Sequence, residues 1–200
     1  MAGASPNKKT ISDIKSKVLN LAQTSVYQVK IQPPKSVSDY LNNNKNFDYN
    51  DSVNGGEFIE LLCSSASLPG SRLATHTSNS YNGFEQRMAY RRQYDDALNL
   101  EFYVDRNYTP IKFFEGWVDY ISGNTNDVSH YRMKYPKDKK GGYWSDNVYV
   151  TKFEKNEGES LEYQFLEAFP INISSIPVYY GNSDILRYSV SIAYTRYKRN

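Results

Sequence analysis

Residues 97–123, ALNLEFYVDRNYTPIKFFEGWVDYISG, carry the pattern that decides the fold. Apolar and polar side chains alternate over residues 98–104, which is the period of a strand with one buried face. Thr109 and Pro110 then offer an N-cap followed by proline at the first helical position. Apolar side chains recur at helical spacing after them, up to Gly123, where a helix can end. The segment predicts a half-buried strand followed by an amphipathic helix, about 110–122.

Upstream of this segment the pattern changes several times. Apolar side chains at helical spacing predict a short helix over about 11–23, and alternation then predicts a strand over 27–31 that two prolines stop. Residues 57–63 form an apolar strand candidate, which ends in the Leu-Pro-Gly turn of residues 68–70. Residues 72–93 are ambiguous and fit a strand with a long polar hairpin.

Downstream, three further strands are predicted. Residues 148–153 and 161–168 read as a pair joined by a hairpin turn at 156–158. The final segment, 186–195, alternates regularly and predicts one strand of about ten residues, longer than usual. Its Leu186, Tyr188, Val190 and Ile192 would face the core of the subunit.

The domain organisation follows from these elements. Residues 1–10 are polar and predict a flexible arm, whereas 11–200 contain no repeat and no linker that would divide them. We expect a single domain with long loops at 33–56 and 124–146. The predicted fold class is β-rich α+β, an antiparallel β-barrel or sandwich with one or two short helices.

Composition narrows the function classes. The chain has 200 residues with 24 basic and 22 acidic side chains, a balance unlike that of proteins that grip phosphate backbones. It carries 19 tyrosines and 19 asparagines, which favours strands, turns and interfaces. No apolar leader or membrane-length apolar run occurs, so neither secretion by the usual route nor a membrane anchor is expected.

Residues that could carry chemistry do not form a recognisable catalytic pattern. Cys63 lies in an apolar strand candidate and reads as a buried structural cysteine, and His76 and His130 read as surface histidines. Adjacent Asp95 and Asp96 fit a turn better than an acid–base pair. We therefore expect no enzyme activity, no cofactor and no metal site.

Basic residues gather in two places. Lysines occur within 134–140, and Arg196, Lys198 and Arg199 end the chain. Either group could contact nucleic acid, or could be a solvated loop or an ion-pairing contact with a neighbouring subunit.

The order of elements carries a resemblance. The sequence resembles the tail tube proteins of contractile-tailed bacteriophages from about Thr24 to Tyr197. The segments that carry the resemblance are VYQVKI at 26–31, FIELLCSSASLPG at 58–70, YDDALNLEFYV at 94–104 with the helix that follows, VYVTKF at 148–153, LEYQFLEAFP at 161–170 and the closing strand at 186–197.

This resemblance implies a function that composition alone does not give. Subunits of the family form hexameric rings, which stack into a hollow tube inside a contractile sheath. The implied partners are further copies of the chain, the sheath protein, baseplate tube-initiating proteins and a tape-measure protein. Genomic DNA would pass through the lumen without sequence recognition. The implied location is the tail of the virion, with assembly in the host cytoplasm.

Two sets of site residues are predicted. By resemblance, the turn at 68–70 and the segment beginning at Phe169 contact neighbouring subunits or rings, and the residues are Leu68, Pro69, Gly70, Phe169 and Pro170. The polar side of the alternating final strand suits a lumen wall, and its residues are Arg187, Ser189, Ser191 and Thr195.

Other functions remain open from the sequence. The long loops would also suit a tube initiator or adaptor of the same fold at the baseplate end. A glycan-binding β-sandwich that stacks sugars on tyrosines and Trp144 is a second alternative. A small enzyme is a third, although no convergent triad or metal cluster supports it.

Overall fold

The computed structural model describes residues 11, 15, 22–44, 47–51, 55–79, 83–125, 128–129, 142–154, 159–181 and 184–200. Several predicted features lie wholly or mostly outside these residues. They are the arm at 1–10, the helix at 11–23, the turn at 156–158, His130, and the insert at 124–146 with its lysines.

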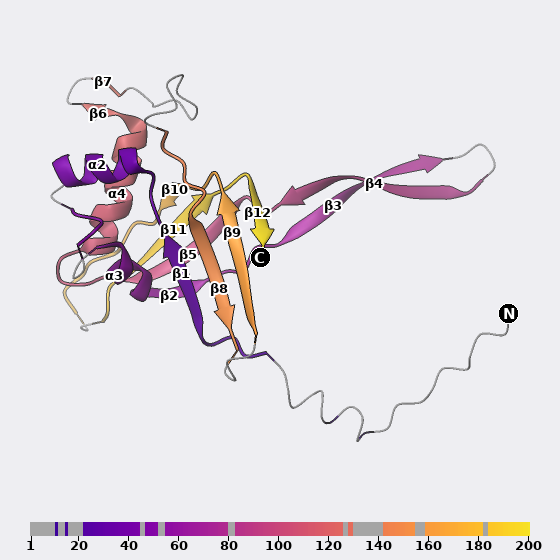
Figure 1. Cartoon of the computed structure of the whole chain (residues 1–200), viewed down its shortest axis with the longest axis horizontal. Helices are drawn as coiled ribbons and strands as arrows, with labels where there is room; N and C mark the ends of the chain where they lie inside the picture. Colours follow the sequence, from indigo (N-terminus) through magenta and orange to yellow (C-terminus); the bar gives the residue numbers. More distant parts are fainter. Residues whose placement is uncertain are drawn as a thin grey trace.

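Two four-stranded sheets form the body of the molecule (Figure 1). The first has the order β1-β8-β9-β12 and the second the order β10-β11-β5-β2, with antiparallel pairing throughout both. The predicted β-rich α+β fold and the pairing of 148–153 with 161–168 are confirmed. The strands of the first sheet are β1 (Tyr27–Ile31), β8 (Val148–Phe153), β9 (Ser160–Leu166) and β12 (Arg196–Arg199). Those of the second are β2 (Cys63–Ala66), β5 (Ala97–Tyr103), β10 (Phe169–Ile173) and β11 (Arg187–Ala193).

Helix α4 (Thr109–Ser122), which the sequence predicts over about 110–122, packs against β10 and β11 of the second sheet. Its buried Phe114 lies 5.3 Å from the ring of Phe102 and 6.3 Å from that of Tyr188, between ring centroids. The buried Trp117 donates its indole N–H to the carbonyl oxygen of Tyr143 at 2.8 Å. The helix ends at Gly123, whose φ of 64° is left-handed and suits glycine.

The start of α4 differs from the prediction in one respect. Thr109 is the first helical residue, and the N-cap position falls on Tyr108, whose side chain makes no capping bond. The carboxylate of Asp105 accepts the Thr109 amide at 2.7 Å and the Thr109 hydroxyl at 2.9 Å. Asp105 therefore supplies the oxygen that the sequence reading assigned to Thr109.

The predicted loop at 33–56 is wrong over much of its length, because it contains α2 (Lys35–Asn44) and leads into α3 (Gly56–Leu61). Val37 and Leu41 are fully buried one helical turn apart, and α2 packs against α4. Polar asparagines dominate the end of α2 and hide this short apolar stripe from a reading of composition.

The predicted strand at 57–63 is also wrong: most of it forms α3. Gly56 and Ile59 are the buried residues of α3, and its two glutamates and Leu61 are good helix formers. The fold requires glycine at position 55, because a Cβ there would lie 2.2 Å from the carbonyl oxygen of Asp51. Close backbone contact of this kind fixes α3 against the loop before it.

The predicted single final strand is two strands in different sheets. Ala193 pairs with Ala97 in the second sheet, whereas Arg196 pairs with Leu166 in the first. Between them the Tyr194 ring packs edge-on against Phe165 at 4.9 Å between centroids. The chain thus crosses from one sheet to the other at the end of β11.

Strands β3 (Ser71–Asn79) and β4 (Glu85–Tyr94) form a long hairpin that projects away from the two sheets (Figure 1). The ambiguous stretch at 72–93 is therefore paired strand over nearly its whole length. Nine residues of extended strand span about 30 Å. A register shift between Ala74 and Thr75 marks a bulge within the hairpin. The short pair β6 (Asn124–Thr125) and β7 (Val128–Ser129) follows α4.

Candidate assembly surfaces

Three of the four predicted lumen residues lie on one polar face. Arg187, Ser189 and Ser191 alternate with the buried Tyr188, Val190 and Ile192 along β11. The Ser191 hydroxyl donates to Asn99 Oδ1 of β5 at 2.9 Å, and the Arg187 guanidinium lies 3.8 Å from the Glu101 carboxylate. Neighbouring strands β11 and β5 thereby present a continuous hydrophilic surface.

Thr195 does not belong to this face. It lies at the crossing between β11 and β12, where its hydroxyl donates to the Glu167 carboxylate at 2.7 Å and its amide to the Leu166 carbonyl at 3.0 Å. These bonds hold the crossing in place.

The turn at 68–70 lies at the root of the hairpin. Leu68 is 48% exposed, and Gly70 donates its amide to the Asp95 carboxylate at 2.7 Å. Leu68 and Pro69 line a hollow of about 420 Å³ together with Phe165 and Tyr194. The turn is accessible to another molecule, and its predicted role in an interface stays a prediction.

Phe169 and Pro170, the second predicted interface segment, both lie in strand β10. Pro170 is buried and faces Ile192 of β11, and a bulge follows it before Asn172. The ring of Phe169 is half-buried and packs edge-on against Tyr143 at 5.1 Å. β10 is an edge strand, which is where a proline is tolerated. The two predicted interface segments are therefore on different elements.

The projecting hairpin is exposed on both faces. Its large apolar side chains stand largely in solvent: Leu73 is 62% exposed, Phe84 79%, Met88 53% and Tyr90 69%. An isolated two-stranded hairpin is marginally stable in water, since it has no core of its own. An exposed apolar surface on such an element indicates an interaction site.

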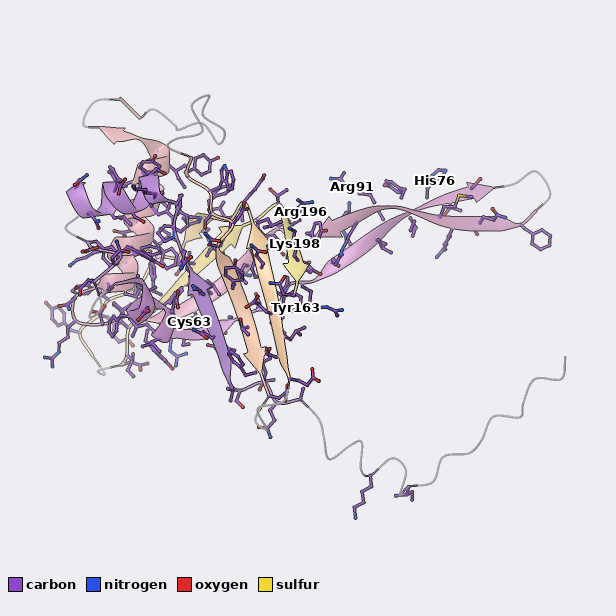
Figure 2. The ribbon with its side chains drawn as sticks, in the orientation of Figure 1. Cys63, His76, Arg91, Tyr163, Arg196 and Lys198 are labelled. Atoms are coloured by element: carbon purple, nitrogen blue, oxygen red, sulfur yellow. The ribbon has the colours of Figure 1, made fainter. Side chains whose placement is uncertain are left out.

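The hairpin is also basic. Arg72, Arg87, Arg91 and Arg92 stand against a single carboxylate, Glu85, in β3 and β4. Figure 2 shows Arg91 and His76 along the hairpin and Arg196 and Lys198 of β12 beside its root. Within the described part of the chain, no carboxylate forms an ion pair with Arg87, Arg91, Arg196, Lys198 or Arg199.

A cluster of four residues, which we call the root cluster, ties the hairpin to β12. Arg92 donates to Ser71 Oγ at 3.0 Å and to the Tyr197 hydroxyl at 3.0 Å. Its guanidinium lies 5.0 Å from the centroid of the Tyr94 ring and 5.2 Å from that of Tyr197. The two rings pack edge-on at 5.2 Å. Planar guanidinium stacking of this kind fixes orientation as well as contact.

At the other end of the molecule, a groove of about 870 Å³ runs between β1 and α3, and we call it the β1–α3 groove. Its exposed apolar side chains include Leu61, 82% exposed, and Val26, 53% exposed. The carboxylates of Asp51, Glu57 and Glu60 line it, with Lys30 as the one cation in its lining.

Hydrogen bonds at the floor of this groove cover the end of β1. Glu60 accepts the amide of Ile31 at 3.1 Å, and the Tyr49 hydroxyl donates to the Ile31 carbonyl at 2.7 Å. Burial raises the pKa of the Glu60 carboxyl and also raises the pKa of Tyr49. These side chains satisfy backbone groups that an edge strand would otherwise leave open.

Cys63 and Tyr27, which also line this groove, form a half-buried contact between the two sheets. The Tyr27 hydroxyl donates to the Cys63 carbonyl at 2.9 Å. Burial raises the pKa of the Cys63 thiol to about 11 and that of Tyr27 to about 12. A thiol in this state is a poor nucleophile at neutral pH.

Two further residues that the sequence offered as candidates for catalysis, His76 and Asp95, lie outside any catalytic arrangement among the described residues. His76 is exposed in β3. The carboxylate of Asp95, directly after β4, accepts the amide of Gly70 and so holds the turn at 68–70 that precedes β3. Among the described residues, no three His, Cys, Asp or Glu side chains come together in a way that could hold a metal ion. Within the same residues, no helix has the length and apolar character needed to span a membrane.

The sequence offered a hairpin as one reading of residues 72–93, but it did not indicate the projection of the hairpin, the root cluster or the β1–α3 groove. A tally of charge by segment would have found part of the signal, because Arg87, Arg91 and Arg92 fall within six residues. The groove gave no such signal, since its walls come from segments that the sequence reading assigned to a loop and a strand.

Chains of similar fold occur in solved contractile injection systems. A chain of the PVC extracellular contractile injection system, in the extended sheath–tube complex, is 13% identical with a TM-score of 0.53, covering 96% of this chain and 99% of that one. A chain of the anti-feeding prophage tube-terminating cap is 12% identical with a TM-score of 0.54, covering 100% and 99%. A chain of the anti-feeding prophage baseplate is 11% identical, with a TM-score of 0.53 over 90% and 97%.

At these identities the likeness concerns the fold. No curated protein matches the chain in sequence. The sequence profile described as phage tail tube protein, however, matches residues 22–200, which include both sheets and the hairpin. Because this match spans nearly the whole chain, the protein belongs to the phage tail tube protein family and is a structural subunit of a tail tube.

Proposed function

We propose that copies of this chain form hexameric rings, which stack into a hollow tube inside a contractile sheath. The family match over residues 22–200 is the observation that carries this proposal. The fold supports it as well, since a similar chain occurs in a sheath–tube complex in the extended state. The role is non-enzymatic.

The polar face of β11 and β5 is the proposed lumen wall. Asn99, Glu101, Arg187, Ser189 and Ser191 are side chains that remain hydrated. Such a wall would let genomic DNA pass without sequence recognition and would hold a tape-measure protein during assembly. The mixed charges of Glu101 and Arg187 pair with each other and leave no strong attraction for phosphates.

The remaining partners belong to the same proposal. A sheath protein would surround the tube, and tube-initiating proteins would meet it at a baseplate. Leu68, Pro69, Gly70 and Phe169 are proposed contacts with neighbouring subunits, whereas buried Pro170 would act through the position of β10. The tube is placed in the tail of the virion, with assembly in the host cytoplasm.

A baseplate-end initiator of the same fold is the second candidate, because a similar chain also occurs in an anti-feeding prophage baseplate. A glycan-binding role gains no support from the tyrosines. Tyr40 packs against Tyr120, Tyr163 against Tyr197, and Tyr94 against Tyr197, so these rings are used within the fold.

Negative-stain electron microscopy across a concentration series tests the proposal. Hollow tubes that grow without a partner would support the tube body. Discrete rings that never elongate would favour the baseplate-end role. A folded monomer at every concentration would contradict both.

Cysteine labelling tests the lumen wall in assembled tubes. In a Cys63→Ser background, Ser189→Cys and Ser191→Cys are expected to react with small maleimides and to resist reagents too bulky to enter the tube. Tyr180→Cys, on a fully exposed residue outside β5 and β11, is the control. Free labelling of residues 189 and 191 by the bulky reagent would exclude the lumen assignment.

A further inference from the structure

The hollow beside the turn at 68–70, which we call the Tyr194 hollow, combines apolar walls with an acidic rim. Its volume is about 420 Å³, and its walls include the apolar side chains of Leu68, Leu98 and Phe165. Among the described residues that line it, two carry carboxylates, Asp95 and Asp96, and none is a cation. A cavity of this composition suits a ligand that is both positively charged and partly apolar.

Tyr194 brings to the hollow a polar group that the fold leaves unused. The residue is only 9% exposed, and its hydroxyl oxygen is buried without a hydrogen-bond partner among the described residues. Its ring packs edge-on against Phe165 at 4.9 Å between centroids, which holds it in the wall of the hollow. Burial and then the charge of Asp95 raise the pKa of Tyr194 to about 12, so the hydroxyl is protonated near this carboxylate at neutral pH. A buried hydroxyl without a partner costs free energy, and a bound ligand would remove that cost.

The two aspartates have oxygen atoms available for a ligand. Asp95 accepts the Gly70 amide through Oδ2 at 2.7 Å, which fixes its carboxylate at the rim. Within the described part of the chain, the Asp96 carboxylate accepts no hydrogen bond, and neither aspartate forms an ion pair. Both residues are exposed, so a ligand can reach them from solvent.

Arginines on the neighbouring surface restrict what kind of cation can bind. Arg72, Arg91 and Arg92 line an adjoining hollow of about 350 Å³, which shares Tyr194 and both aspartates with the first. Their positive charge works against a cation that depends on Coulomb attraction alone. A ligand of the Tyr194 hollow therefore has to gain from apolar contact as well as from charge.

We propose that the Tyr194 hollow binds a small aliphatic amine, whose ammonium group is held by Asp95, Asp96 and the Tyr194 hydroxyl. Its methylene chain then packs against Leu68 and Phe165 on the apolar wall. An ammonium group has three N–H donors for these oxygens, and the bonds to carboxylates are charge-assisted. The aromatic rings of the wall also attract a cation that lies over them.

A metal ion fits the hollow less well than an amine. Calcium takes six or more oxygen ligands, and magnesium requires nearly ideal octahedral geometry. The described residues contain no group of three His, Cys, Asp or Glu side chains that could hold a metal ion. Neither ion would use the apolar wall. The site lies within one subunit and does not depend on tube formation.

Equilibrium dialysis of the full chain against labelled putrescine tests the site, at a protein concentration below that of tube growth. We expect saturable binding, and we expect butanediol, which has the same carbon chain without charge, to leave the label bound. Magnesium chloride at equal ionic strength is expected to displace the label about tenfold less effectively than unlabelled putrescine, since it has no chain to bury. Binding that never saturates, or that magnesium displaces as well as putrescine does, would overturn the proposal.

Two conservative variants separate binding from folding. Asp96→Asn removes one charge from the rim and is expected to weaken putrescine binding about tenfold. Tyr194→Phe removes only the hydroxyl and is expected to weaken it about threefold. Neither group has a hydrogen-bond partner among the described residues, so both variants are expected to unfold at the wild-type temperature or above it. Wild-type affinity in both variants would place the amine elsewhere and overturn the assignment.

Asp39→Asn is the matched control, because it makes the same change in charge on an exposed residue of α2 that does not line the hollow. It is expected to bind putrescine like the wild type. A loss equal to that of Asp96→Asn would attribute binding to net charge and would overturn the site.

A lysine side chain of another protein offers the same chemistry, and the experiment distinguishes it. Saturable binding of free putrescine to the unassembled chain supports the small amine. A chain that binds no putrescine, but whose tube growth is weakened by Asp96→Asn, would assign the hollow to a lysine and overturn the proposal. Because dialysis measures the single subunit, a chain that never forms tubes would reject the proposed function without affecting this test.

Discussion

Asp105 fixes the start of α4 through three hydrogen bonds, to the amides of Asn107 and Thr109 and to the Thr109 hydroxyl. Side chains that cap helix N-termini contribute about 1 kcal/mol. We expect Asp105→Ala to lower the free energy of unfolding by about this amount, measured by urea denaturation.

Asp105→Asn is the control for this prediction. Its amide oxygen can still accept a hydrogen bond from Thr109, so most of the loss is expected to be recovered. Equal stability of the alanine variant and the wild type would show that Thr109 or the turn itself suffices.

Cys63 and Tyr27 make the fold sensitive to alkaline pH. Burial raises the pKa of Cys63 from its ordinary value of 9.0 to about 11, and that of Tyr27 from 10.0 to about 12. The folded state therefore favours their neutral forms, and the unfolded chain ionises first as the pH rises. Their contribution is complete below about pH 9 and is lost as the pH rises through about 11 to 12.

Urea unfolding at pH 7, 9, 10 and 11 measures this effect. Wild-type stability is expected to fall above pH 9, and Cys63→Ser is expected to fall less steeply because serine does not ionise there. Identical slopes for the two proteins between pH 9 and 11 would exclude a contribution from Cys63.

At the scale of elements, the spacing of apolar residues predicted strands and helices correctly where it stayed regular over many residues. Residues 98–104 alternate through β5, and the apolar stripe of α4 spans three turns, so both elements were found. Helix α3 has only six residues, and its three large apolar side chains, Phe58, Ile59 and Leu61, are too few to distinguish a helical period from a strand. Its helical state depends on tertiary contacts, namely Gly55 against Asp51 and Glu60 against Ile31.

The crossing from β11 to β12 shows a different limit. Alternation runs from Leu186 to Thr195 and changes phase at Arg196 and Tyr197, and the sequence reading of a single strand passed over this change, which marks the change of sheet. The exposed face of β11 was nevertheless predicted correctly, because alternation within one strand does not depend on its neighbours. Thr195 was misplaced because it lies beyond the point where the strand ends.

The root cluster sets the direction of the hairpin. Arg92→Ala removes its bonds to Ser71 and Tyr197 and its stacking on two rings, each contact of this kind being worth about 0.5–1 kcal/mol at an exposed site. We expect amide hydrogen exchange at the hairpin root to rise about tenfold, with little change in global stability.

Arg72→Ala is the matched control, since Arg72 lies beside the cluster and bonds only Gln93 among the described residues. It is expected to leave exchange at the root unchanged. Equal exchange in the two variants would show that strand pairing alone holds the hairpin.

At the scale of the whole molecule, a net charge of +2 conceals a basic hairpin, in which four arginines stand against Glu85. Screening shortens electrostatic range from about 10 Å at 0.1 M salt to about 3 Å at 1 M. We expect the critical concentration for tube growth to rise about tenfold between 0.05 and 0.5 M sodium chloride, measured by sedimentation. A critical concentration independent of salt would mean that apolar contacts alone join the subunits.

Of the candidate assembly surfaces, the sequence predicted one and not the other. The polar face of β11 follows from local alternation, whereas the hairpin is exposed on both sides and has no buried period to read. Its function depends on where it points, and that direction comes from Arg92 and Tyr197, which are 105 residues apart in the chain.

The hairpin leaves the body at one end only, and this gives any row of subunits a direction. A tube built from such subunits is polar: one terminus exposes the projecting hairpins, and the opposite terminus exposes the helical end of the molecule. The two termini then grow at different rates and need chemically different stoppers. A protein that caps the terminus with the exposed hairpins has to complement their arginines and exposed apolar side chains, and a protein that caps the other terminus contacts a different surface.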